Sequence, residues 1–103
     1  MTKGIIDIDE YIDKTIKVKF KGKTIDVKEP SARLTKQLIA LEASITEENA
    51  LDIQEETVMM ILNNNKNDVE FTKEDIEDMP FKVQKIILRK IKTMRERIDT
   101  DPN

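Results

Sequence analysis

Carboxylates are the most numerous side chains in this sequence that could take part in chemistry. They gather at 74–78 and recur at or near alternate positions from 7 to 13. The second stretch has the acids that begin a calcium-binding loop, but Ile12 stands where that loop needs glycine and Val18 where it needs glutamate. The acids at 74–78 are typical of a solvated helix face. We therefore predict neither a metal site nor a catalytic pair of carboxylates.

The side chains that most often perform catalysis are missing. The chain has no His and no Cys, which excludes His-based acid–base catalysis, thiol nucleophiles, disulfides and the zinc sites that need either residue. Its two glycines, Gly4 and Gly22, are too few for a phosphate-binding loop. No serine has a neighbouring base to activate it. The sequence therefore predicts a binding protein that is not an enzyme and uses no cofactor.

The charged residues are distributed unevenly along the chain. The formal net charge is −3, but residues 42–79 hold twelve acidic and two basic groups, whereas residues 80–98 hold seven basic groups and one acidic group. In the simpler interpretation, the acidic middle and the basic final segment pair within one domain. In the alternative, the basic segment faces an acidic partner.

Residues 81–98 form the element around which we expect the rest of the chain to be organised. Apolar residues recur there at steps of three and four, the period of one helix face. This seam consists of Val83, Ile87, Ile91, Met94 and Ile98. Ile86 and Leu88 lie about 100° to either side of it, so we expect the helix to pack against more than one neighbour. Its outer side is basic and includes Lys82, Lys85 and Arg89.

A β-hairpin is predicted near the start of the chain. Residues 15–20 alternate apolar and lysine side chains, the pattern of a strand with one buried face. Lys21 and Gly22 make a tight turn, because glycine accepts positive φ, and Ile25 and Val27 face inward on the return strand. A lone hairpin is marginal in water, so its apolar face must lie on helices.

Two longer helices are expected between the hairpin and residue 63. Ser31 caps the first, and Ile39 flanks its apolar face. That face consists of Leu34, Leu38, Leu41 and Ile45. The second helix, 47–62, is apolar on two adjoining sides, one of which includes Leu51, so we expect it at the centre of the fold. Met59 lies on its polar edge.

The remaining elements are short. The asparagine-rich stretch 63–68 ends the central helix, because asparagine tolerates the left-handed conformation found at helix ends. Thr72 then caps a short helix, with Asp75 three residues further on. Asp78 is expected to cap the final helix.

These elements predict an α+β fold, mostly α, with an N-terminal β-hairpin packed on a bundle of three to four helices. Residues 15–98 are expected to form a single domain, 1–14 a flexible arm or short edge strand, and 99–103 a frayed tail. No apolar run approaches the ~20 residues of a membrane span, and the start lacks a signal-peptide core. The expected location is the cytosol.

Three stretches together carry a family resemblance. The phrase EPSARLTKQLIALE, the turn NNNKN and the run FTKEDIEDMPFKVQKII, preceded by a lysine-rich hairpin, resemble the tail assembly chaperones of long-tailed bacteriophages and prophages of Gram-positive bacteria. The likeness runs from about residue 16 to 98. It implies a small non-virion protein of the host bacterial cytoplasm that binds and solubilises the tape-measure protein and helps to recruit tail-tube subunits. It supplies no catalytic residues.

A tape-measure protein is a long, largely helical chain whose apolar stripes would aggregate if left bare. A helical chaperone can cover such a stripe by helix-in-groove contact. The candidate partner-binding residues are the apolar shoulders and basic neighbours of the predicted helices. They are Ile39, Met59, Ile86, Leu88, Lys82, Lys85 and Arg89. The alternative is that the apolar four complete the core. Ile86→Glu or Met59→Glu is expected to abolish binding, and self-association stays open.

Two rival functions remain. A small nucleic-acid-binding regulator would use the basic hairpin and the C-terminal helix, and its affinity would depend strongly on salt. The acidic middle segment and the shortage of aromatic residues make nucleic acid the less favoured partner. A structural virion subunit fits the size but needs more strand than the sequence offers.

Overall fold

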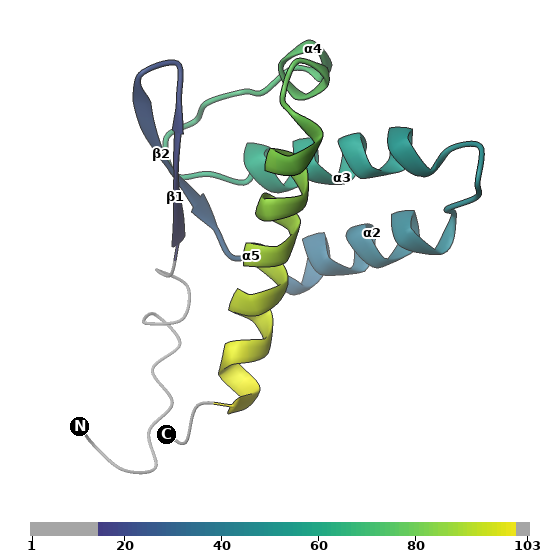
Figure 1. The fold of residues 1–103 in the computed structure, drawn as a ribbon. Helices are drawn as coiled ribbons and strands as arrows, with labels where there is room; N and C mark the ends of the chain where they lie inside the picture. Colours follow the sequence, from purple (N-terminus) through teal and green to yellow (C-terminus); the bar gives the residue numbers. More distant parts are fainter. Residues whose placement is uncertain (1–14, 101–103) are drawn as a thin grey trace.

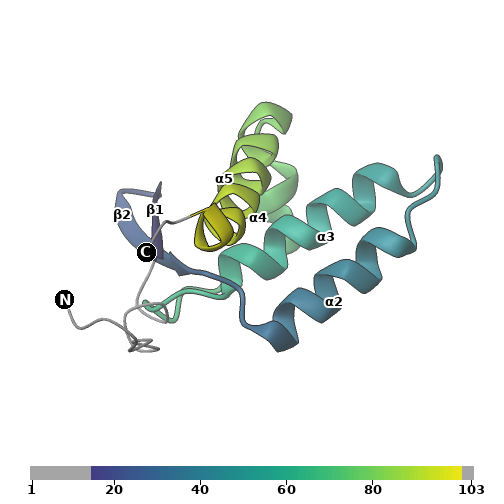
Figure 2. The same ribbon diagram turned by 90° about the horizontal axis from the view of Figure 1, so that it is seen from below.

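A computed structural model describes residues 15–100, and for residues 94–100 it describes the helix backbone alone. The elements are β1 (Thr15–Phe20), β2 (Lys23–Lys28), α2 (Ala32–Ala43), α3 (Ala50–Asn63), α4 (Lys73–Glu77) and α5 (Phe81–Thr100). The hairpin lies on one side, α2 and α3 run antiparallel on the other, and α5 crosses α3 (Figures 1 and 2). The predicted α+β class, mostly α, with a hairpin on three to four helices, is confirmed. The predicted arm at 1–14 lies outside the described residues, and α5 continues to Thr100.

The hairpin forms as its alternating sequence predicts. The strands are antiparallel, and Val18 lies opposite Ile25 in the register. Lys21 and Gly22 both have positive φ, 50° and 81°, as a two-residue turn between twisted strands requires. The inward side chains of β2 are fully buried, and those of β1 pack against them at partial exposure. The ring of Phe20 also meets the ring of Phe71, 4.7 Å away between centroids.

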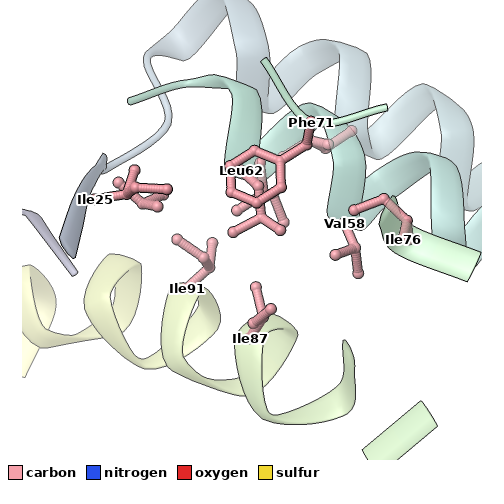
Figure 3. Packing of buried hydrophobic residues seen from close by; sticks show 10 residues of the cluster. Ile25, Val58, Leu62, Phe71, Ile76, Ile87 and Ile91 are labelled. Carbon is pink, nitrogen blue, oxygen red and sulfur yellow. The ribbon is translucent and has the colours of Figure 1, made fainter. Parts of the chain in front are cut away.

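Helix α3 is the central element, as its two apolar sides predict. It packs against α2, α4, α5 and β2. Figure 3 shows Val58 and Leu62 from α3 meeting Ile25 from the hairpin and Ile87 and Ile91 from α5. A helix with neighbours on several sides must be apolar around most of its circumference.

The start of α3 differs from the prediction. The helix begins at Ala50, because Thr46 and Asn49 cap each other: the Thr46 N–H donates to Asn49 Oδ1 (2.6 Å) and the Asn49 N–H donates to Thr46 Oγ1 (3.2 Å). Leu51 was expected on a buried side but is 63% exposed. It lies in the first turn, at the end of α3 that projects away from α5 (Figure 1).

The buried face of α5 is rotated from the predicted seam. Ile87 and Ile91 are buried as expected, but Val83 is 38% exposed and Gln84 is buried. The Gln84 amide donates to the carbonyl of Ile76 (3.0 Å), and its oxygen accepts from the side-chain amide of Gln54 (3.1 Å). These bonds offset the cost of burying a polar group, so Gln84 replaces Val83 in the seam. The side chains of Met94 and Ile98 lie outside the described part.

The asparagine stretch does more than end α3. Asn65 is buried and makes four hydrogen bonds. Its amide donates to the carbonyls of Leu62 and Val69, and its oxygen accepts from the backbone N–H groups of Asn67 and Val69. The stretch was expected to use asparagine in the left-handed conformation, but the residue with positive φ is Asp68 (54°).

The same stretch joins the hairpin to the end of α3. The Lys28 N–H donates to the Asn64 carbonyl (2.8 Å), and the Asp26 N–H donates to Asn67 Oδ1 (2.7 Å). Asn63 binds both backbone groups of Phe71 through its side chain. Because backbone groups at a sheet edge need partners, these bonds give the free edge of β2 part of a second neighbour beside β1.

The predicted caps are confirmed at two helices and wrong at the third. Ser31 Oγ accepts from the Leu34 N–H (3.1 Å), and Thr72 forms a capping box with Asp75. Asp78 was expected to cap α5, but it ends α4. The carbonyl of Pro80 instead accepts the first hydrogen bonds of α5.

Candidate functional site

An open groove of about 470 Å³ is lined by residues of α2, α3 and α5. It exists because α2 and α5 each pack on α3 without filling the space between them. Helix α2 is held to α3 with Leu38 as its one fully buried residue. Ile45, just beyond the end of α2, lines the groove and is 48% exposed. On the opposite wall, Leu88 and Ile91 of α5 complete the apolar lining.

The polar side chains that α3 contributes to the groove are already engaged. The Thr57 hydroxyl donates to the Ile53 carbonyl (2.8 Å), and the Gln54 amide donates to Gln84 (3.1 Å). Apart from Thr57, Gln54 and one charged residue on each wall, the lining of the groove is apolar. The groove is therefore suited mainly to apolar side chains.

The rim of the groove carries opposite charges on its two walls. Glu42 of α2 and Lys92 of α5 are its charged lining residues, and both are exposed. Neither takes part in the ion pairs of the described residues, which are Lys17 with Asp26 and Lys21 with Asp75.

Of the predicted binding residues, Leu88 lines this groove and is partly buried against the core, whereas Ile39, Lys85 and Arg89 lie outside the lining on its two wall helices. Ile39 is 56% exposed and lies about 100° around α2 from Leu38, on the side of Glu42. The exposed Lys85 and Arg89 follow the same edge of α5 as Lys92. A role in partner binding stays a prediction for all four.

The other three predicted residues point elsewhere. Ile86 is partly exposed and lies about 160° from Leu88 around α5. The exposed Lys82 lies about 20° from Arg89 around the helix but two turns before it, and it is not part of the groove lining. Met59 packs against the core and lines a separate, acidic cleft between α3 and α4. The structure therefore divides the predicted set among different surfaces.

Sequence reasoning missed Ile45 as a binding candidate. It was assigned to the buried seam of the first helix, because it continues the four-residue spacing from Leu41. The helix ends at Ala43, so that spacing no longer applies at position 45. The Ser44 N–H donates to the Leu41 carbonyl (3.0 Å) at this end. A serine followed by Thr46 is the signal that could have shown the break.

The expected pairing of the acidic middle with the basic final helix is not made by ion pairs. From Lys82 to Lys92 no basic side chain of α5 lies in an ion pair with an acid among the described residues. Likewise, the part of the chain that the structure describes holds no group of three or more potential ligands placed to bind a metal. In that same part, each helix is too short or too polar to cross a bilayer.

The pKa of Asp75 is lowered by its position at the start of α4. Its side chain accepts the backbone N–H of Thr72 (2.9 Å), which lowers the pKa below its ordinary value. The Thr72 hydroxyl and the ammonium of Lys21, 3.5 Å away, act in the same direction. The lowered pKa is explained by the capping box of α4, and Asp75 is not part of the groove lining.

Comparisons with known proteins add no relative. No protein-family model, curated protein or solved structure matches the chain.

Proposed function

We propose that this chain is a phage tail assembly chaperone that takes up an apolar helical segment of the tape-measure protein in the groove between α2 and α5. The observation that carries the proposal is the apolar groove whose α3 polar groups are internally hydrogen-bonded. The family resemblance of the sequence names the partner. Recruitment of tail-tube subunits and action in the host bacterial cytoplasm, outside the mature virion, belong to the same proposal.

The shape of the groove supports a helix as the bound element. Its α3 lining extends from Ala50 to Ile61, about 16 Å at 1.5 Å per residue, or three helical turns. Peptide helices bind in grooves through apolar residues at positions i, i+3, i+4 and i+7, which occupy a length of that order. An exposed apolar stripe is also what makes a free helical chain aggregate.

The regulator remains the second candidate, because the basic side chains from Lys82 to Lys92 are exposed and form no ion pairs among the described residues. The hairpin is less available. Lys17 lies 2.7 Å from Asp26, and Lys21 lies 3.5 Å from Asp75. DNA held tightly at about 0.2 M salt, where weak phosphate binders are released, would favour the regulator over the chaperone.

The test co-expresses the chain with the tape-measure protein encoded beside it and compares Ile45→Glu with Leu51→Glu. Ile45 and Leu51 are both exposed apolar residues, but Ile45 lines the groove and Leu51 does not. We expect the unchanged chain and Leu51→Glu to keep the tape-measure protein in the soluble fraction. With Ile45→Glu, the tape-measure protein should appear in the insoluble fraction. A partner that stays soluble with Ile45→Glu, or the lack of any tape-measure gene beside this one, would contradict the proposal.

A further inference from the structure

A basic stripe runs along the edge of α5 that borders the groove. Lys85, Arg89 and Lys92 are spaced by four and three residues, so they fall within about 60° of one another around the helix. Lys92 itself lines the groove, and Leu88 lies just inside the stripe. All three cations are exposed, and none forms an ion pair with the described acids, although the Lys85 ammonium lies 4.9 Å from the centre of the Phe81 ring.

The opposite wall has no such stripe. On α2 the groove presents Leu38 and the single charge of Glu42, with Ile39 beyond them. A helix lying in the groove would thus meet Lys92 at one edge, with Lys85 and Arg89 beyond the lining on the same stripe of α5, and an apolar, slightly acidic wall along the other edge. Complementary charges at an interface rim select partners and orient them.

We infer that the segment bound in the groove is an amphipathic helix with acidic residues along one edge of its apolar stripe, at spacings that match Lys85, Arg89 and Lys92. This inference rests on the proposed function and narrows its partner to one class of helix. A helix with lysine along that edge would be rejected, because like charges would face each other across the rim.

Two synthetic helical peptides test the inference. Both peptides have the same apolar stripe of leucines, with glutamine along one edge of that stripe. Along the other edge, the first peptide has glutamate and the second has lysine. We measure binding by fluorescence anisotropy at about 0.05 M salt, where surface charges are weakly screened. The glutamate peptide should bind about ten-fold more tightly, since each exposed ion pair contributes at most a few-fold. The difference should shrink at about 0.5 M salt.

Matched charge reversals on α5 locate the effect. Lys92→Glu should reduce or reverse the preference for the glutamate peptide. Lys90→Glu makes the same change on the same helix, about 160° from Lys92, and should preserve the preference. Both lysines are exposed, so circular dichroism should show the same folded domain for both variants.

The outcomes separate this inference from the proposed function. If both peptides bind equally and Ile45→Glu blocks both, the groove holds helices but the acidic edge is disproved. An equal loss of preference in Lys92→Glu and Lys90→Glu would disprove it as well, because net charge alone would then account for the effect. If neither peptide binds the folded chain, the proposed function itself fails.

Discussion

The two sides of α3 are built in different ways. The side toward the hairpin, α4 and the asparagine stretch, which we call the tethered side, is closed by side-chain hydrogen bonds from residues 63–67. The side toward α2, which we call the groove side, is held mainly by apolar contact around Leu38 and leaves a groove. The exposed Ile39 and Ile45 lie on the groove side.

This difference indicates a division of labour within one small domain. The tethered side supplies the core and fixes the position of α5, whose Ile87 and Ile91 pack there with Ile25 (Figure 3). The groove side leaves apolar surface exposed to water. Such exposure does not stabilise the free domain, and it is typical of a surface that binds a partner. Stability and binding should therefore respond to substitutions on opposite sides of the same helix.

The largest expected effect is on the tethered side. Phe71 is fully buried and contacts the ring of Phe20. Phe71→Ala should lower the free energy of unfolding by about 3–5 kcal/mol, the usual cost of deleting a buried aromatic ring. Urea denaturation measures this cost. A loss below about 1 kcal/mol would mean that the hairpin and α3 do not share a tightly packed core.

A second substitution tests the hydrogen bonds separately from the packing. Asn65→Ala should cost about 2–3 kcal/mol, because it removes partners from backbone groups at Leu62 and Val69, and each unsatisfied buried group costs about 1–3 kcal/mol. Asn67→Ala is the control. Its side chain accepts one hydrogen bond from Asp26 at an exposed position, so its cost should stay below about 1 kcal/mol. If urea denaturation gave the same loss of stability for Asn65→Ala and Asn67→Ala, the buried hydrogen bonds of Asn65 would not be more important than an exposed one.

The tethered side also shows where sequence reasoning succeeds and where it stops. The hairpin follows from strict alternation, and the Thr72 cap from a local pattern with Asp75. Gln84 could not be predicted as core, because its burial depends on two partners, Gln54 and the Ile76 carbonyl, that only the tertiary structure brings within reach. Local patterns predict elements, whereas burial of a polar residue depends on distant ones.

The groove followed less directly from the sequence. Leu88 was identified by its position beside the seam of α5, and it does line the groove. Ile86 has the same apolar character on the other shoulder, and it points away. The sequence pattern shows that two shoulders exist, but the shoulder that borders an open space is decided by how α2 and α5 each pack on α3, which is a tertiary contact.

The groove side should tolerate polar substitution. Ile39→Ser and Ile45→Ser should each change the free energy of unfolding by no more than about 0.5 kcal/mol, since both side chains are about half-exposed in the free chain. The same urea denaturation measures this. A loss above about 2 kcal/mol for either would show that the residue belongs to the core, and the contrast between the two sides would fail.

The smallest expected effect is a pH dependence at the Asp75 cap. Because the folded-state pKa of this carboxyl is lowered, mainly by the Thr72 N–H, its contribution to stability is complete above the ordinary pKa of about 4. The contribution is lost as the pH falls through the lower folded-state pKa. Asp75→Asn should therefore flatten the acid limb of stability against pH. An unchanged acid limb in thermal melts between pH 6 and 2, roughly the range in which carboxyls titrate, would contradict this.

Amide hydrogen exchange tests the central contrast most directly, because it reports both sides of α3 in one experiment. In the free chain, the amides of α2 should exchange faster than those of β2 and α3, since fewer buried contacts hold α2 in place. Adding the peptide with the glutamate edge should slow exchange in α2 and leave the hairpin unchanged. Slowing confined to the hairpin or α4, or no slowing under conditions where the peptide is bound, would contradict a partner site between α2 and α5.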